Sequence, residues 1–247
     1  MSCSLHRITA VLLVSALLAA CATSPTGRRQ LMLVSEDSAI ASSAQAYVQE
    51  VGKLKKEGKL SSDKALIQRV NSITERLVAQ AILMRPDSAD WAWSVAVIDD
   101  PETVNAWCMA GGRMAIYTGL IDKIDPSDDE VAQVMGHEIG HALANHTAEK
   151  MSVAMASSIG VVAVGVASDN KGAAMAGAAA AAALAVTLPN SRTAETEADR
   201  IGIELAAKAG YDPAAAVTLW RKMNNLPGGQ PVSYTHLRAH ETNPCIS

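Results

Sequence analysis

The sequence predicts an α+β fold that is predominantly α-helical, with a small β-sheet beside one helix that carries the motif HExxH. Three observations favour this class: apolar residues recur at helical spacing, two short segments alternate like strands, and a helix-capping signal precedes the motif. Of the 247 residues, 49% are apolar, which is enough for one sizeable core. The formal net charge of −4 gives no electrostatic reason to expect nucleic acid as a partner.

Residues 45–84 are the first predicted helical region, because apolar residues recur there at the spacing of one helix face. Gly58 is expected to divide this region into two helices, since glycine interrupts a helical pattern. The apolar stripe of the second helix consists of Leu66, Ile67, Val70, Ile73, Leu77 and Val78.

Two strands are expected next, over residues 91–98 and 113–118. Gly111 and Gly112 precede the second of them and predict a turn. We expect both strands to flank the helix that follows.

That helix is predicted to begin at Ser127, because Ser127 and Glu130 have the spacing of a capping box. In this motif the serine hydroxyl accepts a hydrogen bond from one unpaired N–H group, and the glutamate accepts one from another. The residues around HExxH are mostly apolar, so the helix is expected to be buried with a polar cluster inside it.

The HExxH motif consists of His137, Glu138 and His141. Helical positions four apart differ by only about 40°, so the two imidazoles can share one metal ion, and Glu138 remains free to act on water. The alternative is a chance occurrence of the pattern. Against it, buried polar groups without a partner cost about 1–3 kcal/mol each, which a metal ion bound to the histidines removes.

A catalytic zinc ion takes three protein ligands, so a third is needed. His146 has the wrong spacing, because it follows His141 by five residues, whereas the long metzincin motif requires six and a glycine where this chain has Ala144. If the helix continues, His146 also lies on the face opposite His137.

A downstream acidic segment offers a better candidate. Glu195 and Asp199 share one helix face, whereas Glu197 is rotated by about 200° from Glu195. Glu195 is therefore the predicted third metal ligand, and Asp199 is predicted to accept a hydrogen bond from a ligand histidine. The alternative is a solvated, charged helix face.

The N-terminus has the features of an exported lipoprotein. Arg7 precedes an apolar run over residues 8–20 that is too short to span a bilayer, so residues 1–20 are predicted to be a signal peptide. The residues before Cys21 resemble a lipobox, in which Cys21 becomes lipidated and residues 21–34 form a lipid-anchored linker. Because Ala22 follows the cysteine, resemblance to sorted lipoproteins indicates the periplasmic face of the outer membrane in a Gram-negative cell. An ordinary secretory signal is the alternative.

The C-terminal residues are interpreted differently. Residues 231–247 include a stretch that resembles the translation of a sequencing adapter, so we expect the natural sequence to be cut near residue 230, with its true C-terminal part missing. Residues 35–230 would then be a C-terminally truncated catalytic domain, and Cys108 would have no disulfide partner, since Cys245 lies in the suspect stretch.

Residues 153–188 form two apolar, alanine-rich halves, over residues 153–167 and 172–188. Both halves fall short of the roughly 18 residues typical of a spanning helix. We favour a helical hairpin against the protein or bilayer surface, which could also cover the cleft as a lid. A transmembrane hairpin is the alternative.

Several motifs together resemble one family. HEIGHALANH followed by SRTAETEAD is similar to the HtpX, Oma and CAAX-prenyl-protease group of gluzincin metallopeptidases, peptidase family M48. Residues 105–120 resemble the strand and loop that precede the active-site helix in this family, with Trp107 for the usual phenylalanine and Ala110 for the usual proline. Residues 25–31 resemble the segment after the lipidated cysteine of bacterial lipoprotein members.

The resemblance implies a zincin-like fold and a zinc-dependent endopeptidase that binds one Zn²⁺ per chain. His137, His141 and Glu195 would hold the ion, and Glu138 would take a proton from the attacking water and return it to the leaving amine. An edge strand would bind the extended substrate backbone. The implied partners are unfolded or misassembled envelope proteins and, through the lipid anchor, the membrane.

Two other functions remain as hypotheses. In the first, the chain is a latent protease that acts mainly as a chaperone or assembly factor for outer-membrane proteins. The second, a prenyl-protein protease, requires several membrane spans around the site, and the sequence offers at most one short hairpin.

Overall fold

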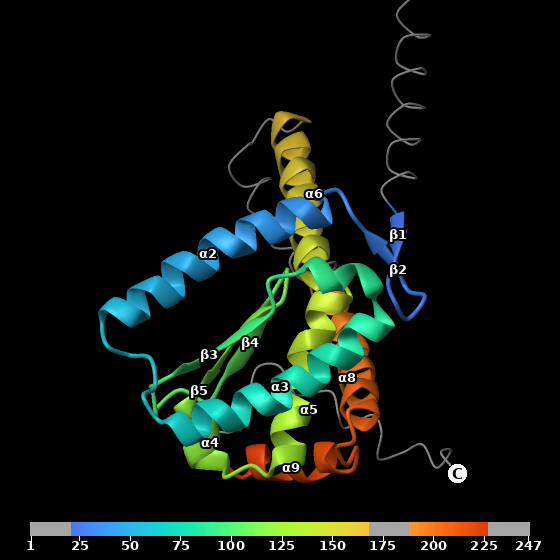
Figure 1. Ribbon diagram of the computed structural model, residues 1–247. Helices are drawn as coiled ribbons and strands as arrows, with labels where there is room; N and C mark the ends of the chain where they lie inside the picture. Colours follow the sequence, from blue (N-terminus) through green and yellow to red (C-terminus); the bar gives the residue numbers. More distant parts are fainter. Residues whose placement is uncertain (1–20, 168–187, 227–247) are drawn as a thin grey trace, which may run out of the picture.

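The computed structural model describes residues 21–167 and 188–226, and it has the predicted architecture of helices around a small sheet (Figure 1). The predicted signal peptide, residues 172–187 and residues 231–247 lie outside the described residues. In chain order the elements are β1 (Cys21–Thr23), β2 (Arg29–Leu31), α2 (Glu36–Lys56), α3 (Lys64–Met84), the 3₁₀ helix η1 (Pro86–Asp90), β3 (Ser94–Ile98), β4 (Ala106–Met109), β5 (Arg113–Tyr117), α4 (Thr118–Ile124), α5 (Asp128–Leu143), α6 (His146–Ala167), α8 (Leu188–Lys208) and α9 (Ala215–Asn224).

Helices α2 and α3 occupy the region predicted to be two helices. Gly58 lies between them with a φ of 70°, a left-handed conformation that favours glycine. Helix α2 begins earlier than predicted, at Glu36, because the Ser35 side chain accepts a hydrogen bond from the backbone N–H of Ser38. The predicted stripe of α3 packs into the core, where Val70, Ile73 and Leu77 are fully buried and Leu66, Ile67 and Val78 partly so.

The three-stranded sheet has the order β3-β5-β4, with β3 parallel and β4 antiparallel to β5. Strands β3 and β5 lie within the two predicted segments, whereas β4 was indicated only by the family resemblance. The turn between β4 and β5 requires glycine, because Gly111 and Gly112 have φ values of 84° and 82°. A Cβ atom on Gly112 would also lie 2.5 Å from the ring of Trp93.

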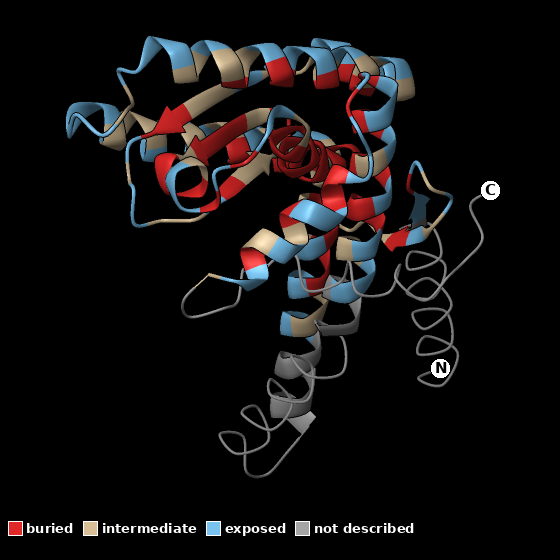
Figure 2. Ribbon diagram, turned by 90° about the horizontal axis from the view of Figure 1, so that it is seen from below, coloured by how far each residue is buried: buried red, intermediate tan, exposed pale blue. Residues whose placement is uncertain are grey.

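Helix α5 carries the HExxH motif through the centre of the molecule, and nearly all of it is buried (Figure 2). Its start is the predicted capping box: Glu130 N–H donates to the Ser127 hydroxyl over 3.2 Å, and Ser127 N–H donates to the Glu130 carboxylate over 2.8 Å. Thr218 and Lys222 of α9 also donate to Glu130 over 2.7 Å, so the same glutamate ties α9 to α5.

Helices α5 and α8 pack unusually closely because glycines face each other across the contact. A Cβ atom on Gly202 of α8 would lie 2.6 Å from the backbone nitrogen of His137, and one on Gly136 would lie 2.8 Å from the Gly202 carbonyl oxygen. A Cβ atom on Gly140 would lie 2.8 Å from the Ala198 carbonyl oxygen. Backbone atoms cannot rotate away, so these glycines set how near α8 comes to the HExxH residues.

Residues 21–34, expected to be a linker, contain the antiparallel hairpin of β1 and β2. Gln30 in β2 is buried and donates a hydrogen bond of 2.7 Å to the carbonyl of Ala144, so the hairpin contacts the turn that follows α5. The first apolar half of residues 153–188 lies in α6. No helix within the described ranges is long and apolar enough to cross a membrane.

Candidate metal centre

Two helices bring three metal-binding side chains together, the histidines from α5 and a glutamate from α8. The Nε2 atoms of His137 and His141 lie 3.0 Å apart, and the Glu195 carboxylate lies 3.4 and 3.5 Å from them. Ligand atoms bound at about 2.0–2.1 Å to one tetrahedral zinc ion lie about 3.3 Å apart. The donor types and the spacing therefore both fit zinc, and the three residues that the sequence predicts as metal ligands lie together as a group that could hold one ion, called the metal-binding group below.

The ligands differ in exposure. The His137 side chain is 3% exposed, whereas those of His141 and Glu195 are 19% and 16% exposed. The group is thus held by the protein core on one side and is accessible on the other. A catalytic site needs such an open side, since a substrate must reach the metal.

Asp199 lies one turn after Glu195 on α8, and its carboxylate is 2.8 Å from Nδ1 of His137. Because a carboxylate only accepts, His137 donates from Nδ1 and can present Nε2 to a metal. Burial by itself lowers the pKa of His137, but Asp199 and Glu195 outweigh it and raise the pKa to about 10. In the metal-free chain this histidine therefore carries a proton that a metal ion must displace.

Glu138 lies beside the ligands in a buried position, 7% exposed. Burial raises the pKa of its carboxyl above the usual value, although the charges of His137 and His141 lower it in part. The backbone N–H of Cys108 in β4 also donates a hydrogen bond to this carboxylate. A buried carboxyl with a raised pKa binds a proton more readily than an exposed one, which suits a general base.

His146 lies next to His141 and not on the opposite face, because the helix does not continue. Helix α5 ends at Leu143, and Asn145 adopts a left-handed φ of 55° before α6 begins. Nδ1 of His146 is 2.8 Å from Nδ1 of His141, and its Nε2 is 3.2 Å from the Glu197 carboxylate. His146 is thus outside the metal-binding group but contacts the ring of His141, which belongs to that group. Asparagine tolerates this conformation well, so Asn145 was the available sequence signal for the break.

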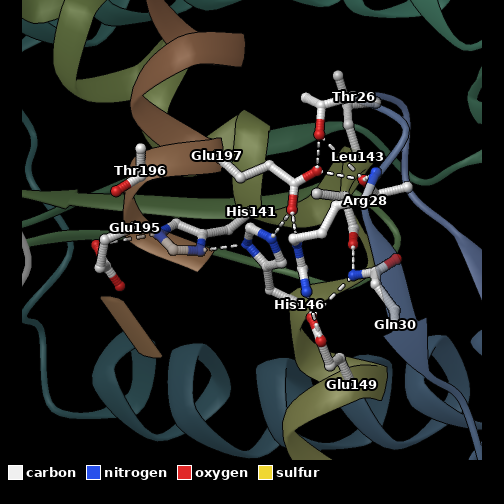
Figure 3. Close-up of polar contacts among 12 residues, drawn as sticks. Thr26, Arg28, Gln30, His141, Leu143, His146, Glu149, Glu195, Thr196 and Glu197 are labelled. Atoms are coloured by element: carbon white, nitrogen blue, oxygen red, sulfur yellow. Dashed lines mark hydrogen bonds and ion pairs between the residues drawn. The ribbon is translucent and has the colours of Figure 1, made fainter. Parts of the chain in front are cut away.

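Glu197 and Arg28 form a second polar group that the sequence did not reveal (Figure 3). Arg28, in the turn of the N-terminal hairpin, donates to Glu197 over 2.6 Å and to both oxygens of Glu149 over 2.7 and 2.6 Å. Burial raises the pKa of Glu197, but hydrogen bonds from His146, the hairpin hydroxyls and Arg28 outweigh it and lower the pKa well below its usual range. The acidic segment is therefore not a solvated face at Glu197, which is 5% exposed.

Cys108 of β4 is not a member of the metal-binding group. Cys108 is a free thiol, and burial, aided by the nearby charge of Glu138, raises its pKa well above its usual value. A raised pKa disfavours the thiolate, which is the reactive form of cysteine. Cys21, the predicted lipidation site, is the first residue of β1.

A site in which an HExxH helix supplies two ligands and a base, and a later helix supplies a glutamate, is typical of zinc-dependent peptidases. Comparison with protein families gives the same class. The family model of peptidase family M48 matches residues 64–245, and the chain belongs to this family.

Known relatives support the assignment. The chain is 40% identical over 139 residues to a mitochondrial metalloendopeptidase OMA1 of Arabidopsis thaliana, covering 56% of this chain and 27% of the relative. It is 33% identical over 159 residues to OMA1 of Schizosaccharomyces pombe, covering 64% of this chain and 44% of the relative. It is 28% identical over 180 residues to the beta-barrel assembly-enhancing protease of Escherichia coli, covering 70% and 36%. The chain thus spans less than half the length of each of these relatives.

Proposed function

We propose that this protein is a zinc-dependent metalloendopeptidase that hydrolyses peptide bonds of misfolded or stalled cell-envelope proteins. The observation that carries the proposal is the placement of Glu138, a buried carboxyl with a raised pKa, beside three side chains whose spacing fits one zinc ion. A purely structural zinc site usually has four protein ligands and needs no adjacent base.

In the proposed mechanism, His137, His141 and Glu195 hold the metal. Zinc bound there supplies Lewis-acid chemistry, which lowers the pKa of water and polarises the peptide carbonyl. Glu138 accepts the proton of the attacking water and later donates it to the leaving amine. Asp199 fixes the ring of His137 by accepting its Nδ1 hydrogen.

Strand β4 is the proposed site for the substrate backbone. It forms one edge of the sheet, and its Cys108 N–H is directed at Glu138 and away from β5. An extended peptide paired with this edge would therefore run past the general base. Main-chain pairing tolerates many sequences, which suits an enzyme that acts on unfolded proteins.

The cellular setting is proposed from the N-terminus and from the names of the relatives. A lipid on Cys21 would anchor the enzyme to the periplasmic face of the outer membrane. One relative is named for enhancing β-barrel assembly, and this supports envelope proteins as substrates. Replacing Cys21 by serine should release the protein from the membrane fraction, whereas retention of the serine variant there would contradict the anchor.

The hydrolytic function is tested with purified, zinc-loaded protein and unfolded, fluorescence-quenched casein. We expect cleavage that a zinc chelator abolishes, and loss of cleavage with retained zinc binding in the Glu138→Gln variant. Glu204→Gln is the matched control, because Glu204 is an exposed residue of α8 paired only with Lys208 among its described contacts. Full activity of Glu138→Gln, or equal loss in both variants, would refute the assignment.

A second candidate function, a latent protease acting mainly as a chaperone for outer-membrane proteins, is favoured by the name of the same relative. Binding alone does not require a general base. If Glu138→Gln prevents aggregation of an unfolded β-barrel protein and rescues a deletion strain as well as the wild type does, the chaperone function is the main one. If it does neither, proteolysis is the main function.

A further inference from the structure

We propose that the N-terminal hairpin orients a ligand of the metal site. Its Arg28 holds Glu197 in place, Glu197 holds His146, and His146 fixes the ring of His141 for metal binding. This inference rests on the proposed zinc function. It concerns a segment outside residues 64–245, the range that the family model matches.

The first step is the immobilisation of Glu197. Its two carboxylate oxygens accept hydrogen bonds from Ser24 and Thr26 on one side, and from Arg28 and His146 on the other. Three of these four donors belong to the hairpin. The Glu197 side chain is 3% exposed, so water has little access to replace them. The hairpin therefore determines where this carboxylate lies.

The hairpin is itself fixed to the segment after the HExxH helix. The guanidinium of Arg28 binds both oxygens of Glu149 in a bidentate pair, a geometry that restricts orientation as well as distance. Gln30 donates to the same carboxylate over 2.9 Å and to the carbonyl of Ala144 over 2.7 Å. Figure 3 shows Arg28 between the two glutamates, with His146 beside Glu197.

The second step is the choice of tautomer. Because Glu197 only accepts, the neutral ring of His146 must donate from Nε2, and its Nδ1 is left as an acceptor. His141, whose Nδ1 is 2.8 Å from that acceptor, must then donate from Nδ1. The Nε2 lone pair of His141 is consequently directed to the metal-binding group.

An independent contact agrees with this assignment. The Nε2 atoms of His137 and His141 are 3.0 Å apart, so in the metal-free chain one of them must accept. The chain of hydrogen bonds makes His141 the acceptor. Thus Asp199 orients one ligand histidine, and Glu197 orients the other through His146. Supports of this kind typically change metal affinity by about 10–100-fold when removed.

The experiment measures zinc affinity by competition with a chromophoric chelator, and the His141 tautomer by ¹⁵N NMR of the metal-free protein. Arg28→Gln and His146→Leu should each bind Zn²⁺ about 10–100-fold more weakly than the wild type. In the wild type His141 should carry its hydrogen on Nδ1, and in His146→Leu this preference should be lost. His146→Gln, which keeps one donor and one acceptor, should retain more affinity than His146→Leu and serves if the leucine variant does not fold.

Arg69→Gln is the matched control, because Arg69 also pairs with a carboxylate, Asp128, but at the opposite end of α5. It should leave zinc affinity unchanged. Wild-type affinity in Arg28→Gln and in His146→Leu, an unchanged tautomer in His146→Leu, or an equal loss in Arg69→Gln would overturn the inference. If the wild type itself binds no zinc, the proposed function fails, which is a distinguishable result.

Discussion

Replacing Gly202 by alanine perturbs the helix contact that assembles the metal site. The added Cβ atom would lie 2.6 Å from the backbone nitrogen of His137 and 2.8 Å from its Cα. An ordinary contact of about 3.4 Å requires the two helices to separate by about 0.8 Å at this point. Because the obstacle is backbone, no side-chain rotation relieves it.

Two effects should follow from this separation. Overpacking typically costs about 1–3 kcal/mol of unfolding free energy, and the higher helix propensity of alanine recovers at most about 1 kcal/mol. Glu195 and Asp199 lie on the displaced helix, so they move relative to the histidines. A misplacement of about 1 Å can cost about 100-fold in rate, and we expect a loss of at least tenfold in peptide cleavage and in zinc affinity.

The assay combines chemical denaturation, zinc affinity and casein cleavage. Gly52→Ala in α2 is the control, because a Cβ atom there meets nothing within 4 Å. It should stabilise the protein by about 0.5–1 kcal/mol without changing zinc affinity. A Gly202→Ala variant with wild-type stability and zinc affinity would refute the argument that close packing of α5 and α8 builds the site.

Three further predictions concern the same helices. Asp199→Asn should weaken zinc binding about 10–100-fold, because the amide can donate to His137 and favour the wrong tautomer; wild-type affinity would contradict this role. Ser127→Ala should lower the unfolding free energy by about 0.5–2 kcal/mol in urea denaturation, and an unchanged midpoint would contradict the importance of the cap. Zinc affinity should rise between pH 6 and 8, about tenfold per pH unit for one released proton. The sign follows because the pKa of His137 is raised to about 10 in the metal-free chain, so zinc binding displaces a proton throughout this range. Calorimetry in buffers of different ionisation enthalpy measures the released proton. A zinc affinity that does not change with pH would contradict the prediction.

Much of the fold could be predicted from local signals. The capping box at Ser127 needs only residues within one turn, and the spacing of His137 and His141 follows from helix geometry alone. The apolar stripe of α3 is likewise a property of one helix. Such features depend on neighbours in sequence, so a single sequence is sufficient to predict them.

The remaining features depend on contacts between distant segments. Arg28 and Glu197 are 169 residues apart in sequence, and the two motifs that contain them give no sign that they meet. The position of His146 depended on the end of α5, where a left-handed Asn145 redirects the chain after Leu143. A continuous helix would have placed His146 on the opposite face, so this one backbone conformation decides whether it meets His141.

We propose that His137, His141 and Glu195 hold one zinc ion. A crystal structure of the zinc-loaded protein, with anomalous diffraction measured at the zinc absorption edge, would locate that ion. We expect one anomalous peak about 2.0–2.2 Å from Nε2 of each histidine and from a carboxylate oxygen of Glu195. A peak coordinated by His146 in place of Glu195, or no peak between α5 and α8, would contradict it.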